Sequence, residues 1–180
     1  MILLIDLNWK KNSLGYDEFV VPILTLAERL DSCTVKHYLD VTSQDLNHCN
    51  NIILSGNALK DKAFMSEAEK FLWLRQTEKP VLGICAGMEI IGLIFGARLD
   101  PLLEIGMTQI TSVKDNPLFC GEFKAYSLHN YCIEPADMFD ILAKSTKCVQ
   151  AIRHKSKKLF GVLFHPEVRN QEIVSNFISQ

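Results

Sequence analysis

Short apolar runs alternate with amphipathic stretches along the first half of the chain. Apolar runs of this length are typical of strands buried on both faces of a parallel sheet, and amphipathic stretches are typical of helices. Strands are predicted at Ile2–Leu7, Thr34–Leu39, Asn51–Leu54 and Pro80–Ile84. Helices are predicted at Asp17–Leu30 and from Ser66 onward, where Ser66 and Glu69 have the spacing of a capping box. This alternation predicts a doubly wound α/β fold.

The apolar stretch Pro80–Gly92 continues from the last of these strands straight into a further helix. Cys85 stands at the junction, between Gly83 and Gly87. A sharp turn from strand to helix needs small neighbours, because the two backbones come too close for side chains. The pattern therefore predicts a nucleophile elbow, in which the N–H groups at the start of the helix lower the pKa of the thiol. A cysteine that merely packs behind a tight turn is the alternative that this stretch leaves open.

Beyond the elbow helix the pattern changes to shorter strands separated by turns. They are predicted at Ala97–Leu99, Thr108–Val113, Phe123–Ser127, Phe139–Ala143, Val149–Arg153 and Leu159–Phe164, with a closing helix at Asn170–Ile178. No linker, repeat or low-complexity segment divides the chain, so we expect one domain over residues 1–180. The predicted fold is α/β, with a mostly parallel, doubly wound sheet and an additional antiparallel strand region in the second half.

Composition and charge limit what the chain can bind. Of its 180 residues 48% are hydrophobic, enough for a full core, and the formal net charge of −2 gives no reason to expect nucleic acid or an anionic membrane as a partner. No apolar run is long enough to cross a membrane and no signal peptide is evident, so we expect a cytoplasmic protein. The six cysteines include no CxxC pair, and we expect reduced thiols without a metal site.

A candidate base for the Cys85 thiol lies near the end of the chain. The stretch Gly161–Val168 reads GVLFHPEV, so His165 follows a predicted strand and Glu167 comes two residues later. His165 can take the thiol proton, while Glu167 can hold the other ring nitrogen and stabilise the imidazolium. Cys85, His165 and Glu167 are therefore the predicted catalytic residues of a thiol hydrolase.

The motifs GICAG at the elbow and FHPE around His165 together resemble those of the class I glutamine amidotransferases. The resemblance spans nearly the whole chain and implies the flavodoxin-like fold of that family. In the second half the chain also resembles the amidotransferase subunit or domain of GMP synthase. The stretches that carry this second likeness are DNPLF at Asp115–Phe119, SLHN at Ser127–Asn130, FDILAKS at Phe139–Ser145 and GVLFHPEV at Gly161–Val168.

The resemblance implies an oxyanion hole made of backbone N–H groups. One donor is Ala86, directly after the nucleophile. The family takes the second from an SGGP turn, and this chain has SGNA at Ser55–Ala58, which makes Gly56 and Asn57 the candidates. Asparagine can donate its N–H and tolerates positive φ better than most residues, although an ordinary Asn-containing turn is the alternative. Ala58 in place of proline is expected to loosen the loop.

Four further residues are predicted to contact the substrate. Glu89 stands where the family has a glutamine that contacts the substrate amide, and a carboxylate there cannot donate a hydrogen bond unless protonated. Its charge is expected to raise the pKa of Cys85 unless Glu89 is turned away or neutralised, and a solvated helix glutamate is the alternative. His129, Asn130 and Tyr131 fall where the family has a loop whose backbone binds the amino-acid end of glutamine. For His129 a structural role is the alternative.

These features predict a glutamine amidotransferase subunit that needs no metal or organic cofactor. It would hydrolyse the side-chain amide of L-glutamine and release ammonia. Because no phosphate-binding loop or second domain is evident, the ammonia would go to a separate ATP-dependent synthetase. The synthetase of GMP synthase is the candidate. A γ-glutamyl hydrolase of a peptide or conjugate is one alternative, and a weakly active regulatory paralogue that binds a partner is another. The departures from the family pattern at Asn57, Ala58, Glu89 and Leu163 leave substrate choice and rate open.

Overall fold

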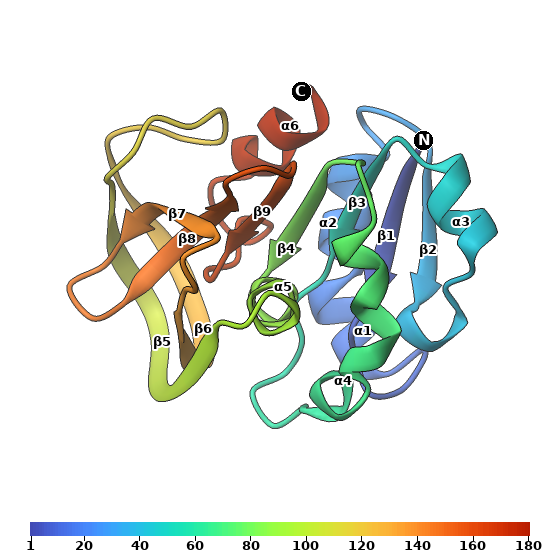
Figure 1. Cartoon of the computed structure of the whole chain (residues 1–180), viewed down its shortest axis with the longest axis horizontal. Helices are drawn as coiled ribbons and strands as arrows, with labels where there is room; N and C mark the ends of the chain where they lie inside the picture. Colours follow the sequence, from blue (N-terminus) through green and yellow to red (C-terminus); the bar gives the residue numbers. More distant parts are fainter.

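Nine strands form one mixed sheet in the computed structural model, which describes residues 1–180 (Figure 1). The strands are β1 (Ile2–Asp6), β2 (Cys33–His37), β3 (Asn51–Leu54), β4 (Val81–Ile84), β5 (Arg98–Ser112), β6 (Glu122–Glu134), β7 (Phe139–Lys144), β8 (Val149–His154) and β9 (Leu159–Val162). Their order in the sheet is β2-β1-β3-β4-β9-β8-β7-β5-β6. Neighbours from β2 to β9 are parallel, and those from β9 to β6 are antiparallel. The predicted α/β class, with a parallel part and an antiparallel region, is confirmed.

Helices cover both faces of the parallel part of the sheet. They are α1 (Leu14–Phe19), α2 (Val21–Ala27), η1 (Tyr38–Asp40), α3 (Ser43–His48), α4 (Ala63–Ser66), η2 (Ala68–Arg75), α5 (Ala86–Ile94) and α6 (Glu172–Ile178). Alternation along β1 separates two cores: Ile2 and Leu4 pack with residues of α2 and α6, while Leu3 and Ile5 pack with residues of α5 and η2. Burial on both faces explains why β1 is apolar from Ile2 to Ile5.

The helix predicted at Asp17–Leu30 is two helices that meet at Val20. Pro22 lies in the first turn of the second one, α2. Proline has no N–H to donate and disfavours a helical residue before it, so it is tolerated in a first turn but not in a helix interior. The break is therefore a direct consequence of Pro22, which the apolar periodicity alone does not reveal.

The capping box predicted at Ser66 and Glu69 is wrong. Ser66 is the last residue of α4, and the helix that follows, η2, begins at Ala68 without a side-chain cap. A capping box is formed instead by Thr42 and Asp45, where each side chain accepts a hydrogen bond from the other residue's backbone N–H. This box opens α3, a helix that was not predicted.

Two predicted strands, Ala97–Leu99 and Thr108–Val113, are parts of the single long strand β5. The pairing with β6 shifts register between Pro101 and Glu104, so a β-bulge lies inside the strand and no break separates its two parts. The strand predicted at Phe123–Ser127 likewise extends to Glu134 as β6. The segment expected to be a substrate loop is therefore part of a strand.

No helix of the structure is long and apolar enough to span a bilayer.

Candidate active site

Three neighbouring strands bring the predicted catalytic residues to one edge of the sheet. β3, β4 and β9 are parallel, with Leu54 paired to Gly83 and Ile84 paired to Val162. Their carboxyl ends therefore lie side by side, and the residues that follow each strand meet there (Figure 1). Ser55–Asn57 follow β3, Cys85 follows β4, and His165 follows β9 by three residues.

Cys85 stands at the predicted elbow between β4 and α5. Its φ of 50° and ψ of −104° are strained for a residue with a side chain, and its N–H donates to the carbonyl of Val162 at 2.8 Å. A Cβ on Gly83 would lie 2.4 Å from the backbone of Gly87, and one on Gly87 would lie 2.6 Å from the carbonyl oxygen of Leu54. Both glycines are required because strand and helix approach too closely for any side chain.

His165 is held beside the elbow by its backbone and by its partner Glu167. Its N–H donates to the carbonyl of Tyr126 at 2.8 Å, and its ring packs against Phe19 of α1 with ring centroids 5.5 Å apart. Nδ1 of His165 lies 2.7 Å from Oε1 of Glu167, and both side chains are buried. This pairing fixes the ring orientation and leaves Nε2 as the nitrogen available for proton transfer.

Cys85 and His165 are electrostatically coupled. Burial raises the pKa of the Cys85 thiol, His165 opposes the rise, and the carboxylates of Glu89 and Glu167 add to it. Burial by itself would lower the pKa of His165, but Glu167 and Cys85 outweigh it and hold that pKa well above its ordinary value. The buried Nε2 of His165 has no hydrogen-bond partner. The pKa of each group therefore depends on the protonation of the other.

The loop after β3 offers two backbone donors beside the thiol. No hydrogen bond within the protein uses the N–H of Gly56 or Asn57. Neither residue has a positive φ, so the tolerance of asparagine for that region is not needed. A Cβ on Gly56 would lie 2.6 Å from Cε1 of His165 and 3.6 Å from Cβ of Cys85, which places Gly56 directly against both side chains. Ala86, the first residue of α5, has an N–H without an intrahelical acceptor.

Glu89 is buried rather than solvated, and its exposed fraction is 3%. Burial raises its pKa to about 7, while the ammonium of Lys62 acts in the opposite direction. The carboxyl is therefore partly protonated near neutral pH and can donate as well as accept a hydrogen bond. Lys62 was not predicted as a site residue, and its position a few residues beyond the Ser55–Ala58 loop was the one signal in the sequence.

β6 contains the predicted substrate residues His129, Asn130 and Tyr131, whose side chains contact different parts of the protein. The carbonyl of Leu128, which was not predicted, lies 3.5 Å from Sγ of Cys85, so the backbone of this segment borders the thiol. Asn130 donates to the carbonyl of Leu59 at 2.8 Å and accepts from Lys62 at 2.6 Å. Nζ of Lys62 also lies 4.2 Å from the ring centroid of Tyr131.

The side chain of His129, by contrast, is directed at Glu104 of β5, with Nε2 3.3 Å from Oε2. Burial lowers the pKa of His129, although Glu104 opposes this effect. The alternative of a structural role for this side chain therefore fits its surroundings better than contact with a substrate.

Access to the thiol is restricted. Cys85 is 3% exposed, and none of five surface hollows of about 230 to 580 Å³ is lined by Cys85, His165 or Glu167. One of these hollows lies over the loop that contains Ala58 and Lys62. The thiol is therefore nearly covered in this structure, beside the loop after β3 and the adjacent part of β6.

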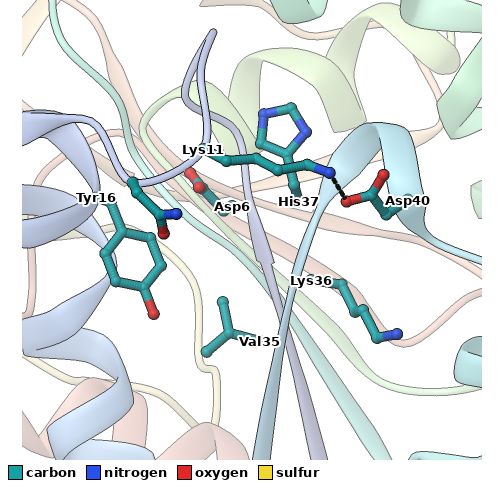
Figure 2. Close-up of a pocket in the computed structure, with 8 residues that line it drawn as sticks. Asp6, Lys11, Tyr16, Val35, Lys36, His37 and Asp40 are labelled. Carbon is teal, nitrogen blue, oxygen red and sulfur yellow. Dashed lines mark ion pairs between the residues drawn. The ribbon is translucent and has the colours of Figure 1, made fainter.

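A separate hollow of about 230 Å³ lies at the carboxyl ends of β1 and β2, and Figure 2 shows the side chains that line it. Its lysines are paired with carboxylates: Lys11 forms an ion pair with Asp40, and Lys36 lies 3.4 Å from Asp45. Because both lysines are paired with carboxylates and no thiol lines the hollow, we assign it no catalytic role.

Comparison of the sequence with known protein families identifies the family of the chain. A model of the class I glutamine amidotransferases matches residues 16–180. The chain belongs to the class I glutamine amidotransferase family. The elbow at Cys85 and the base at His165 both lie within the range that the family model matches.

Individual relatives of the chain are also similar to it in sequence. A glutamine-hydrolysing GMP synthase subunit of Picrophilus torridus is 32% identical over 163 residues, which cover 84% of this chain and 86% of the relative. The corresponding subunit of Methanocaldococcus jannaschii is 38% identical over 109 residues, or 54% of this chain. The match spans 58–59% of the length of this second relative and of two others.

The fold is also similar to a crystal structure from Thermoplasma acidophilum that is assigned provisionally as a GMP synthase subunit. The TM-score is 0.85 at 24% identity, and the superposition covers 99% of this chain and 92% of the other. At this level of identity the comparison establishes the fold alone.

Proposed function

We propose that the chain, acting as one domain over residues 1–180, hydrolyses the side-chain amide of L-glutamine with Cys85 as nucleophile. The observation that carries this proposal is the meeting of three loops at one sheet edge in a member of the amidotransferase family. The elbow places Cys85 beside His165, and Glu167 holds the far side of the His165 ring at 2.7 Å. These groups are the parts that thiol-dependent amide hydrolysis requires.

The first half of the reaction forms a thioester. His165 takes the proton of Cys85 as the sulfur attacks the carboxamide carbon, and a tetrahedral intermediate forms. His165 then gives that proton to the departing nitrogen and the C–N bond breaks. Ammonia is released, and a γ-glutamyl thioester remains on Cys85. Burial raises the pKa of Cys85, but the raised pKa of His165 favours transfer of the thiol proton to its ring, so the pair is expected to react as thiolate and imidazolium.

The second half returns the enzyme to its starting state. His165 removes a proton from a water molecule, whose oxygen attacks the thioester, and glutamate leaves as the sulfur regains a proton from His165. In both halves the negative oxygen would be held by the N–H groups of Ala86 and of Gly56 or Asn57. Two of these donors, Gly56 and Asn57, have no acceptor within the protein.

Substrate recognition is assigned to Glu89 and to the segment His129–Tyr131. With its pKa raised to about 7, Glu89 can both accept from and donate to a carboxamide at neutral pH, which a glutamine in its place would also do. The border that Leu128 forms with the thiol supports a role for the backbone of His129–Tyr131 at the amino-acid end of the substrate.

Ammonia released in this way would be delivered to a separate ATP-dependent synthetase subunit. The relatives described as one subunit of GMP synthase support this step, since one named subunit implies another. We propose the GMP-forming synthetase as the partner. The restricted access to Cys85 further suggests that the partner opens or reorders the loop after β3.

A γ-glutamyl hydrolase is a second candidate, because a buried carboxyl at Glu89 differs from the glutamine typical of the family. Such an enzyme would use the same three catalytic residues on a γ-glutamyl peptide or conjugate. A regulatory paralogue would instead bind a partner without forming a thioester.

The experiment that separates these functions is labelling with a diazo-ketone analogue of glutamine, followed by peptide mapping. Labelling confined to Cys85 and blocked by excess glutamine is expected, with Cys33 and Cys132 as internal controls because both are half-buried free thiols. Ammonia release from glutamine should disappear in Cys85→Ala. Labelling by γ-glutamyl dipeptide analogues but not by the glutamine analogue would favour the hydrolase, and retained ammonia release in Cys85→Ala would contradict the mechanism.

A further inference from the structure

A buried polar cluster lies in the antiparallel region, apart from the catalytic residues. It is formed by Glu104 of β5, His129 of β6 and Cys148, which directly precedes β8. One ligand atom of each residue lies within 4.8 Å of the other two. Glu104 and His129 are directly paired across β5 and β6, so the sheet itself holds two of the three side chains together.

The cluster leaves hydrogen-bonding capacity unused. The side chain of His129 is fully buried, yet neither ring nitrogen makes a hydrogen bond of good geometry. The side-chain oxygen of Gln150 is also buried without a partner, while its Nε2 contacts Oε2 of Glu104 at 3.1 Å and Sγ of Cys148 at 3.2 Å. Buried polar atoms without partners are uncommon and call for an explanation.

We propose that Glu104, His129 and Cys148 bind a divalent ion of the zinc class, with Gln150 as the neighbouring fourth group. A thiolate, an imidazole and a carboxylate are the ligands that Zn²⁺ takes, whereas Mg²⁺ and Ca²⁺ prefer oxygen alone. Glu104 and His129 lie on two strands and Cys148 precedes a third, which is why no metal-binding spacing is visible in the sequence.

Binding requires one proton to leave and one amide to turn. The S–H bond of Cys148 breaks, the sulfur binds the ion, and the proton goes to solvent; no electrons are exchanged. A bound divalent ion favours this loss of the proton, because it binds the thiolate directly. Rotation of the Gln150 amide would remove Nε2 from the centre and turn its unpartnered oxygen inward.

The one cation at the cluster does not block it. Nζ of Lys147 lies 3.2 Å from Oε1 of Glu104, whereas His129 and Gln150 face the other oxygen, Oε2. Lys147 is 54% exposed and can remain on Oε1 or move into solvent. Oε2 is therefore directed at the other members of the cluster, and Lys147 does not occupy it.

An ion at this place would join two parts of the sheet that are otherwise weakly connected. The β5–β6 hairpin pairs with β7 at only two positions, Thr111 with Lys144 and Ser112 with Ala143 (Figure 1). Ligands from β5, β6 and the start of β8 would bridge the remaining separation. Since Leu128 next to His129 borders the Cys85 thiol, the ion would also steady the segment of β6 beside the catalytic centre.

The test uses Co²⁺ as a spectroscopic substitute for Zn²⁺ in the full chain carrying Cys85→Ala, so that the catalytic thiol cannot contribute a ligand. We expect one Co²⁺ per chain, with the visible bands of tetrahedral cobalt and a thiolate charge-transfer band, and displacement of both by Zn²⁺. Adding Cys148→Ser should abolish the thiolate band and weaken binding at least about tenfold. Adding Glu104→Gln should weaken binding while the thiolate band remains.

Cys33→Ser is the matched control, because Cys33 is also a partly buried thiol whose pKa burial raises to about 11, and it lies on β2. It should leave the cobalt spectrum unchanged. Absence of a thiolate band in the folded Cys85→Ala chain would overturn the proposal, and so would a band that persists after Cys148→Ser. Because the catalytic cysteine is absent throughout, neither result depends on glutamine hydrolysis.

Discussion

Nδ1 of His165 lies 2.7 Å from Oε1 of Glu167, and a single proline separates the two residues in the sequence. Both side chains are buried, so the ion pair is shielded from solvent. The negative charge of Glu167 is one of the groups that hold the pKa of His165 above its ordinary value. The pair therefore sets both the orientation and the basicity of the ring.

Replacing Glu167 by Gln is expected to lower kcat for glutamine hydrolysis by roughly 10² to 10⁴-fold, since the imidazolium loses its counter-charge. The pKa of His165, followed by NMR titration of its ring protons, should fall. Glu172→Gln, an exposed neighbour at the start of α6, is the control and should change neither quantity. An unchanged His165 pKa in Glu167→Gln would contradict the assigned role.

Glu89 is expected to make the stability of the protein depend on pH. Its carboxyl has an ordinary pKa of 4.5 and a pKa of about 7 in the folded chain. Between these values the folded state holds a proton that the unfolded state has released, so the stabilisation present at low pH is lost as the pH rises to about 7. Glu89→Gln removes this dependence. We expect the variant to gain on the order of 2–3 kcal/mol over the parent at pH 8 and much less at pH 5.

Urea unfolding at the two pH values measures this difference, with the exposed Glu69→Gln as the control that should show none. A Glu89→Gln variant whose advantage is the same at pH 5 and pH 8 would mean that the carboxyl is not held in its protonated form by burial.

The elbow and the parallel strands of the first half could be predicted because local rules determine them. Cys85 between Gly83 and Gly87 follows from how closely a strand and a helix can approach, and uninterrupted apolar runs mark strands covered on both faces. Pro101 lies inside β5, although proline is disfavoured within a strand. It is tolerated here since β5 pairs with β7 only near Thr111 and Ser112, so the second edge of β5 at Pro101 needs no ladder hydrogen bond.

Contacts between distant segments were beyond prediction from one sequence. Nothing near Lys62 indicates that its ammonium reaches Asn130 on β6, and the side chain of His129 could not be directed toward Glu104 before the pairing of β5 with β6 was known. The residue types at the catalytic centre were visible because they form motifs, whereas their supporting partners form none.

Gly56 is expected to be essential because of the space it leaves for His165. A Cβ at this position would lie 2.6 Å from Cε1 of His165, so Gly56→Ala must displace the ring or the loop. The φ of Gly56 is not positive, and the backbone itself can accept alanine. We expect a loss of activity of about 100-fold with little loss of stability, since small displacements of catalytic groups have effects of this size. Kinetics and thermal unfolding measure the two effects separately.

Ala58→Gly, two residues along the same loop, is the control for Gly56→Ala and should retain most of the activity. If Gly56→Ala is as active as the parent, His165 does not work from the position that it occupies in this structure.

The loop after β3 is expected to be held closed by Asn130. This side chain donates to the carbonyl of Leu59 and accepts from Lys62, so Asn130→Ala removes two hydrogen bonds between β6 and the loop. Each is worth about 1 kcal/mol, and local opening of the loop should become at least about tenfold more frequent. Hydrogen exchange of the Gly56–Lys62 amides measures this opening.

Asn51→Ala, which removes one amide hydrogen bond to Ile178 at the other end of β3, is the matched control. Exchange that rises equally in both variants would indicate general destabilisation, whereas a rise confined to Asn130→Ala identifies Asn130 as the tether of the loop beside Cys85.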